Sequence, residues 1–149
     1  MAIARGAGTE IIRCHHFEGV NDTTEILIFG EQHHIYTVLS VAVTCMGLNA
    51  ASDMLYLSVR GYDSKAGTTN QLNRITAMNM AVLDTFVWND KFSFNGHEPI
   101  DFTGPMDDAT KQNAIADQGS SVAQKLVAAC TDSSDEFEIT VTFIDQNNS

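Results

Sequence analysis

The stretch IYTVLSVAVTC, residues 35–45, alternates between two faces with a period of two, and this alternation decides the fold. Alternation with many β-branched residues predicts a long strand with one buried face. The run is too short, and too often interrupted by hydroxyl side chains, to cross a membrane as a helix. We expect the buried face to be the odd-numbered one, which carries Ile35, Thr37, Leu39, Val41, Val43 and Cys45.

Further strands are predicted on both sides of this stretch, separated by turn-forming residues. The run EILIF at 25–29 is apolar on both parities, which predicts a strand covered on both faces. The segment 71–80 also fits a helical stripe, but its β neighbours favour a strand. Asn89–Asp90 interrupts the run 85–94 and indicates a bulge or a tight turn. The other predicted strands are 9–17, 54–60, 125–131 and 137–144, the last with Phe137, Ile139, Val141 and Phe143 facing inward.

This pattern of seven or eight strands, with at most one short helix at 107–118, indicates an all-β fold. Because the strands do not alternate with long helices, a parallel α/β fold is disfavoured. The predicted architecture is an antiparallel β-sandwich of the jelly-roll type. A length of 149 residues suits one domain, which we expect to span 9–149 behind a flexible N-terminal arm at 1–8.

The composition argues against several classes of partner. Hydrophobic residues make up 44% and charged residues 18%, which is typical of a globular protein. The net charge of −11, with only 8 Lys and Arg, argues against nucleic-acid binding and against an anionic membrane surface. The first ten residues contain no apolar core of a signal peptide, and we expect synthesis in the cytoplasm.

The three cysteines, Cys14, Cys45 and Cys130, are odd in number and far apart, without a CxxC pair. Each lies in an apolar or alternating run. We therefore expect buried, reduced thiols and no disulfide.

Histidine pairs are the first candidates for a metal site. Neighbouring residues on a strand point to opposite faces, so each pair can offer only one ligand to an interior site. The two-apart histidine spacing of cupins and the HExxH motif are absent. We expect these residues to lie at strand edges or at a subunit contact, with no metal site and no cofactor; they are His15, His16, His33, His34 and His97.

The acidic clusters 107–108 and 132–136, and Glu98 with Asp101, do not match the EF-hand loop and are predicted to be solvated turns. Ser120–Ser121 does not lie in a GxSxG elbow, and no phosphate-binding loop is present. We therefore predict a protein that is not an enzyme. The aromatic residues of the run 85–94 share one parity and are predicted to belong to the core; they are Phe86, Trp88, Phe92 and Phe94.

Four stretches carry a resemblance to a known group of proteins: MAIARGAGTEIIR, IFGEQHHIYTVLSV, FVWNDKFSFNG and DDATKQNAIADQGSSVAQKL. They resemble small virion proteins of tailed bacteriophages, especially marine ones. The resemblance implies a small β-sandwich, often trimeric, that decorates or cements a capsid by binding the major capsid protein at local threefold positions. It implies a location on the virion surface and carries no catalytic residues.

Under this reading the N-terminal arm and the Gly/Pro-containing loop are the predicted partner contacts. The outward positions are rich in uncharged polar residues, which suits a protein covered by its neighbours. The candidate contact residues are Ala2, Ile3, Ala4, Arg5, Glu98, Pro99, Ile100, Asp101 and Phe102. Two alternatives stay open: a tail-associated jelly roll that binds carbohydrate or a receptor, which an exposed Trp88 would favour, and a metal-dependent small-barrel enzyme.

Overall fold

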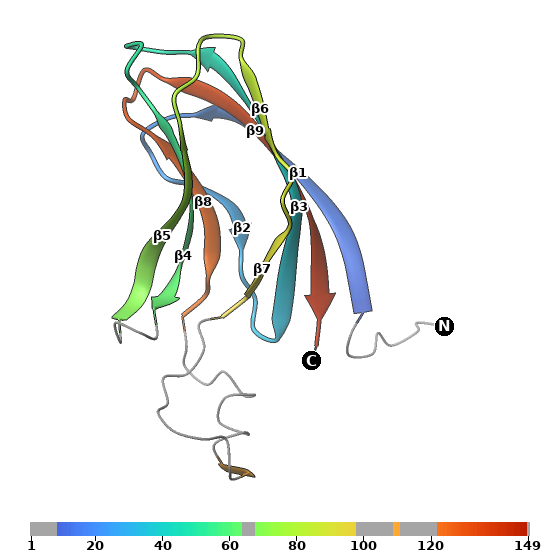
Figure 1. The fold of residues 1–149 in the computed structure, drawn as a ribbon. Helices are drawn as coiled ribbons and strands as arrows, with labels where there is room; N and C mark the ends of the chain where they lie inside the picture. The colour runs from blue at the N-terminus through green and yellow to red at the C-terminus, as the bar shows by residue number, and fades with distance from the viewer. Residues whose placement is uncertain (1–8, 64–67, 98–108, 111–121, 149) are drawn as a thin grey trace.

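The computed structural model describes residues 9–63, 68–97, 109–110 and 122–148. Two antiparallel sheets pack against each other, which confirms the predicted β-sandwich (Figure 1). Sheet A consists of β1 (Thr9–Val20), β3 (His34–Gly47), β6 (Thr85–Trp88), β7 (Phe92–Asn95) and β9 (Glu136–Asn147). Sheet B consists of β2 (Glu25–Phe29), β4 (Leu55–Asp63), β5 (Thr68–Met78) and β8 (Lys125–Cys130).

The strand order is that of a jelly roll. Sheet A has the order β1-β9-β3-β6, with β7 also paired to β3, and sheet B has the order β2-β8-β4-β5. Because β6 and β7 pair with successive parts of β3, they act as one strand interrupted at residues 89–91. Counted in this way, eight strands form two four-stranded sheets, and each sheet combines strands that are far apart in the sequence.

The long strand β3 changes its buried face in the middle. Tyr36 and Val38 are buried before Leu39, whereas the odd-numbered Val41 and Val43 are buried after it. The pairing with β9 shifts between Val38 and Ser40, which leaves Leu39 as the extra residue of a β-bulge. A bulge reverses the alternation, because one residue is inserted on one strand only. The prediction of a continuous odd-numbered buried face was therefore right only for the second half of the strand.

The core lies between the sheets and draws side chains from both of them. The inward face predicted for the last strand is confirmed, since Phe137, Ile139, Val141 and Phe143 are all fully buried. The four aromatic residues of β6 and β7 are partly buried and pack against this core, as predicted.

Several predicted boundaries were wrong. Strand β1 continues to Val20, and β9 continues through the polar residues to Asn147. Strand β2 is an edge strand whose Ile26 and Phe29 are 40% and 58% exposed, so it is not covered on both faces. Within the predicted helix at 107–118, Ala109 and Thr110 are helical, and the rest lies outside the described residues, as does the arm at 1–8. No helix within the described ranges has the length and apolar character needed to span a membrane.

Three chain segments cross closely at the end of the sandwich where β3 begins, which we call the pocket end. The Gly30 N–H donates to the Gln124 carbonyl, the Gln124 N–H to Gly96, and the Gly96 N–H to His34, each at 2.8 Å. A methyl group on Gly30 would overlap the Gly96 carbonyl, and one on Gly96 would overlap the Glu31 carbonyl. Glycine is required at both positions because backbone occupies the space of a side chain.

The cysteines divide into two kinds. Cys45 and Cys130 are buried, as predicted, whereas Cys14 is exposed on the outer face of β1, so the prediction of three buried thiols was wrong. Burial raises the pKa of Cys45, and it raises the pKa of Cys130 to about 12. Cys14 faces outward because it occupies an even position of β1, opposite Thr142.

We expect Ellman's reagent to modify one thiol per chain rapidly when the outer face of sheet A is uncovered, as it is in a monomeric chain. Cys14 is accessible, whereas Cys45 and Cys130 are shielded and are not ionised at neutral pH. Cys14→Ser should remove the fast phase, and unfolding in guanidinium should restore the two slow thiols. A fast phase that survives in Cys14→Ser would contradict the burial of the other two cysteines.

Candidate functional site

A chain of ionisable side chains lies at the pocket end and centres on Asp145 of β9. Arg13 Nε donates to Asp145 Oδ2 at 3.1 Å, and His34 Nδ1 donates to Asp145 Oδ1 at 2.6 Å. The other ring nitrogen of His34, Nε2, lies 3.3 Å from Glu31 Oε2. The Asp145 carboxylate is almost fully buried, so this pairing satisfies a charge that would otherwise be costly.

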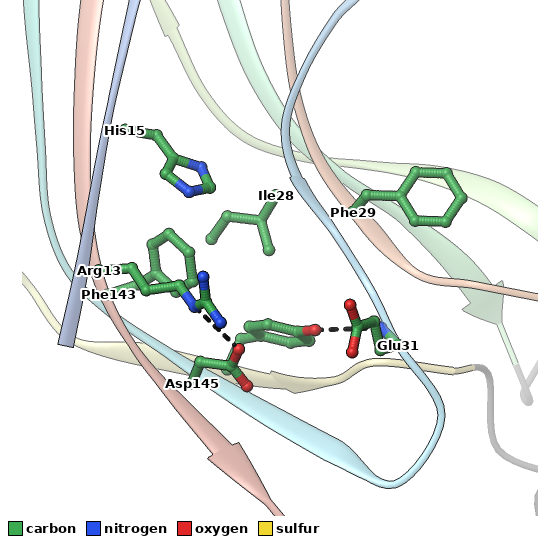
Figure 2. A pocket seen from close by; sticks show the side chains of 8 residues that line it. Arg13, His15, Ile28, Phe29, Glu31, Phe143 and Asp145 are labelled. Atoms are coloured by element: carbon green, nitrogen blue, oxygen red, sulfur yellow. Dashed lines mark hydrogen bonds and ion pairs between the residues drawn. The ribbon is translucent and has the colours of Figure 1, made fainter. Parts of the chain in front are cut away.

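Arg13, Glu31 and Asp145 border a cavity of about 120 Å³ between the two sheets. Figure 2 shows His15, Ile28 and Phe143 around its interior, whereas Phe29 lies apart at its edge. The His15 ring meets Phe143 edge to face, with ring centroids 5.0 Å apart, and its Nδ1 donates to the Leu27 carbonyl at 3.1 Å. The cavity lining therefore combines apolar side chains with polar groups, among them Arg13 and Asp145 on the side formed by β1 and β9.

Tyr36 supplies a further polar atom of the cavity. Its hydroxyl oxygen accepts the Glu31 N–H at 3.1 Å, and its ring stacks between His34 and Phe94. Burial is the largest cause that raises the pKa of Tyr36 to about 12, so the phenol is neutral in the physiological range. None of the residues that line the cavity is Ser, Thr or Cys. The arrangement can hydrogen-bond a small polar molecule, and among the lining residues that the structure describes the hydroxyl belongs to Tyr36.

The pair His15–His16 behaves as strand alternation requires. His15 points inward, whereas His16 points outward and its Nδ1 lies 2.8 Å from Thr140 Oγ1. His34 belongs to the Asp145 chain, and His97 forms an isolated bridge with Ala123. In the part of the chain that the structure describes, no three His, Cys, Asp or Glu side chains form a group that could hold a metal ion.

The predicted partner-contact residues, from Ala2 to Arg5 and from Glu98 to Phe102, lie outside the described residues. Trp88, whose exposure would favour the carbohydrate-binding alternative, does lie within the described residues. Trp88 packs against the core, and its indole N–H donates to the Asp90 carbonyl at 2.9 Å. That side chain is therefore not the exposed stacking platform that carbohydrate binding at this position would need.

A buried pair of carboxyl groups lies at the opposite end of the sandwich and was missed from sequence. Asp135 belongs to an acidic turn predicted to be solvated, yet it is 3% exposed, and Asp53 is 6% exposed. Asp135 accepts N–H groups from Asn49 and Asp132, while Asp53 accepts the Ala50 N–H. Burial raises the pKa of Asp53, and its hydrogen bond to Asp135 and the charge of Asp135 raise it further, against the effect of the Ala50 N–H.

Asp53→Asn should flatten the pH dependence of stability above pH 4. In the wild-type protein the raised pKa means that the folded state holds the proton more tightly than the unfolded state, so stability falls as the pH rises above the ordinary value of 3.8. An asparagine amide can donate to Asp135 without adding charge. Urea unfolding between pH 4 and pH 8 measures this slope. Asp22→Asn, in an exposed turn, should leave the slope unchanged, and an unchanged slope in Asp53→Asn would contradict the assignment.

The outer face of sheet A forms a surface that carries almost no charge, which we call the A face. Strand registers align its outward residues in rows that cross β1, β9, β3 and the β6–β7 strand. Three consecutive rows contain no Asp, Glu, Lys or Arg. They consist of Ile12, Ile144, Thr37 and Ser93; Cys14, Thr142 and Ser40; and His16, Thr140, Ala42 and Val87.

Hydroxyl groups on the A face bond one another across the strands. Thr37 Oγ1 lies 2.9 Å from Ser93 Oγ, and Thr44 Oγ1 lies 3.2 Å from Thr85 Oγ1. On the same face, Ile12 is 69% exposed and Val87 is 52% exposed. Depletion of charge with exposed aliphatic side chains is typical of the centre of a protein–protein interface.

No protein-family model matches the chain, and no curated protein does either. A solved structure with a similar course of the chain is described as "Bacillus endospore appendages form a novel family of disulfide-linked pili". It shares 10% sequence identity, covers 100% of this chain and 96% of its own, and has a TM-score of 0.42. A likeness at this level carries no conclusion about what this chain does. None of these comparisons points to a bacteriophage protein.

Proposed function

We propose that this protein is a non-enzymatic structural component of an assembled particle. The observation that carries the proposal is the A face, whose three central rows lack charged residues in a chain with a net charge of −11. Covering an exposed sheet of this character with a neighbour lowers the free energy, because little charge has to be desolvated. The sandwich serves as a rigid body that presents this face.

The finer form of the proposal is a capsid decoration or cement protein of a tailed phage. It is supported by the sequence resemblance to small virion proteins. In this role the A face joins copies into a homotrimer, and the segments Ala2–Arg5 and Glu98–Phe102 bind the major capsid protein. Each attached trimer would bury surface between itself and the capsid protein. This contact would have to be broken before the shell opens, so attachment would stabilise the shell.

Solution mass tests the self-association through the A face. We expect light scattering to give about 48.6 kDa, the mass of three chains of 16.2 kDa, both with and without EDTA. Thr142→Lys introduces a charge into the middle row and should yield a folded monomer. Asn73→Lys, at an exposed position of β5, is the matched control and should remain trimeric. A wild-type monomer at every concentration, or a trimer of Thr142→Lys, would contradict this use of the A face.

Binding to a shell is tested separately, by sedimenting the protein with purified phage heads that lack it. Deletion of residues 2–8 should lower occupancy while leaving the unfolding transition unchanged. Unchanged occupancy would reject a role of the arm in attachment.

A further inference from the structure

A second surface of the molecule has the opposite character to the A face. It is a groove on the outer face of sheet B, between β8, β4 and β5, with a hollow of about 80 Å³. Ser58 and Val127 form its floor and are nearly inaccessible, although both lie on the outside of the sheet. They are covered by longer side chains that stand around them, among them Tyr56, Arg60 and Arg74.

Cations gather at this groove. Arg60 lies directly opposite Lys125 of β8, and Arg74 lies opposite Ser58. These are three of the five Lys and Arg among the described residues of a chain whose net charge is −11. Like charges directly opposite each other on neighbouring strands destabilise a sheet. Their concentration here gives this face a local positive field on an otherwise acidic molecule.

The described residues do not supply carboxylates to compensate these charges. The ion pairs found within the described ranges involve Arg13, His16 and His34, and none involves Arg60, Arg74 or Lys125. Instead, Arg74 lies 4.1 Å above the Tyr56 ring, and Lys125 lies 5.1 Å from the Phe29 ring. Stacking on aromatic rings holds the cationic groups in place while leaving their hydrogen-bond donors available.

Apolar side chains border the same cations. Leu72 is 43% exposed on the β5 side, and Ile26, opposite Val127, is 40% exposed on the β2 side. A ligand that fits both features carries negative charges spaced along an apolar or neutral backbone. An extended polypeptide has this form, because alternate side chains on one face repeat about every 7 Å.

We propose that the groove on sheet B is a docking site for an acidic, extended segment of a partner polypeptide. Carboxylates of the segment pair with Arg60 and Arg74, and Lys125 adds to the field at the same edge. An apolar side chain of the segment lies on Leu72. This site is separate from the A face. The molecule would therefore present an uncharged interface on sheet A and a charge-selective interface on sheet B.

Fluorescence anisotropy with labelled ten-residue peptides tests the proposal. We expect a peptide of alternating Glu and Thr to bind, and an alternating Gln and Thr peptide to bind about tenfold more weakly or worse. Arg60→Ala with Arg74→Ala should weaken binding of the Glu peptide by about tenfold. Lys91→Ala removes an exposed cation outside the groove and should leave binding unchanged. Added salt should weaken the interaction, because both partners are solvent-exposed.

Other occupants of the groove give different results. Equal binding of the Glu and Gln peptides, or full binding by the double variant, would overturn the proposal. Tighter binding of a ten-nucleotide single strand than of the Glu peptide would assign the groove to nucleic acid instead. If the protein self-associates and Arg60→Ala with Arg74→Ala abolishes this association, the groove would be assigned to a second copy of this chain. A failure of the A face variants to alter the oligomer would leave these outcomes unaffected, since the two surfaces are tested by different substitutions.

Discussion

Gly96→Ala is expected to lower the free energy of unfolding by about 3 kcal/mol. The added Cβ would overlap the Glu31 carbonyl and lie 2.8 Å from the Glu31 nitrogen. Relief requires the two backbone segments to separate. That movement would strain the hydrogen bonds in which the Gly96 N–H donates to His34 and the Gly96 carbonyl accepts from Gln124, both 2.8 Å long. Because the neighbour is backbone, a side-chain rotation cannot make room.

Gly47→Ala, in β3, is the matched control. Its Cβ would lie 3.9 Å from the Glu136 Cβ, which is an ordinary contact. We expect a change within about 1 kcal/mol, and a gain is possible because alanine restricts the unfolded chain. Urea unfolding measures the free energy of unfolding of both variants. The two values can be compared if the dependence of this free energy on urea concentration is unchanged. Equal stabilities of Gly96→Ala and Gly47→Ala would show that the segments crossing at the pocket end can separate enough to accept a methyl group.

The architecture was predictable from the sequence because strand alternation is a strong local signal. The run 137–144 shows this best, since each odd position is apolar and each is buried. Loop signals then separated the strands well enough to indicate a jelly roll.

The bulge at Leu39 could not be predicted in the same way. Leu39 is apolar and fits the odd-numbered pattern of its neighbours, so composition does not distinguish an extra residue from a regular one. The register shift is visible only in the pairing with β9, where Val38 lies opposite Phe143 and Ser40 lies opposite Thr142. The exposure of Cys14 was missed for a simpler reason, since an alternating run has an outward parity as well as an inward one.

The Asp145 site had a sequence signal that was not followed far enough. Extending the buried parity of 137–143 by two positions reaches Asp145, and the inward parity of β1 contains both Arg13 and His15. Charged residues on a buried parity predict a paired site. The partnership of Asp53 with Asp135 carried no such signal, because it joins two loops that are 82 positions apart and adjacent only in the folded sandwich.

Phe143→Ala is expected to lower the free energy of unfolding by about 3–5 kcal/mol, the usual range for removal of a buried aromatic side chain. Phe143 is 1% exposed and lies opposite Val38 next to the β3 bulge. Its ring contacts His15 edge to face and lies 5.9 Å from the Tyr36 ring. Truncation therefore removes packing from both sides of the cavity at the pocket end and enlarges a hollow that the fold already contains.

Phe29→Ala is the matched control, because it makes the same chemical change at a residue of the same cavity that is 58% exposed. We expect a loss of about 1 kcal/mol or less, since little apolar area is returned to water. Urea unfolding of the two variants compares the stability lost at a buried residue of the cavity with the stability lost at an exposed one. A loss for Phe143→Ala as small as that for Phe29→Ala would mean that the sheets close over the vacated space. In that case the pocket end would be deformable, and its crossing at Gly30 and Gly96 would not hold the two sheets at a fixed separation.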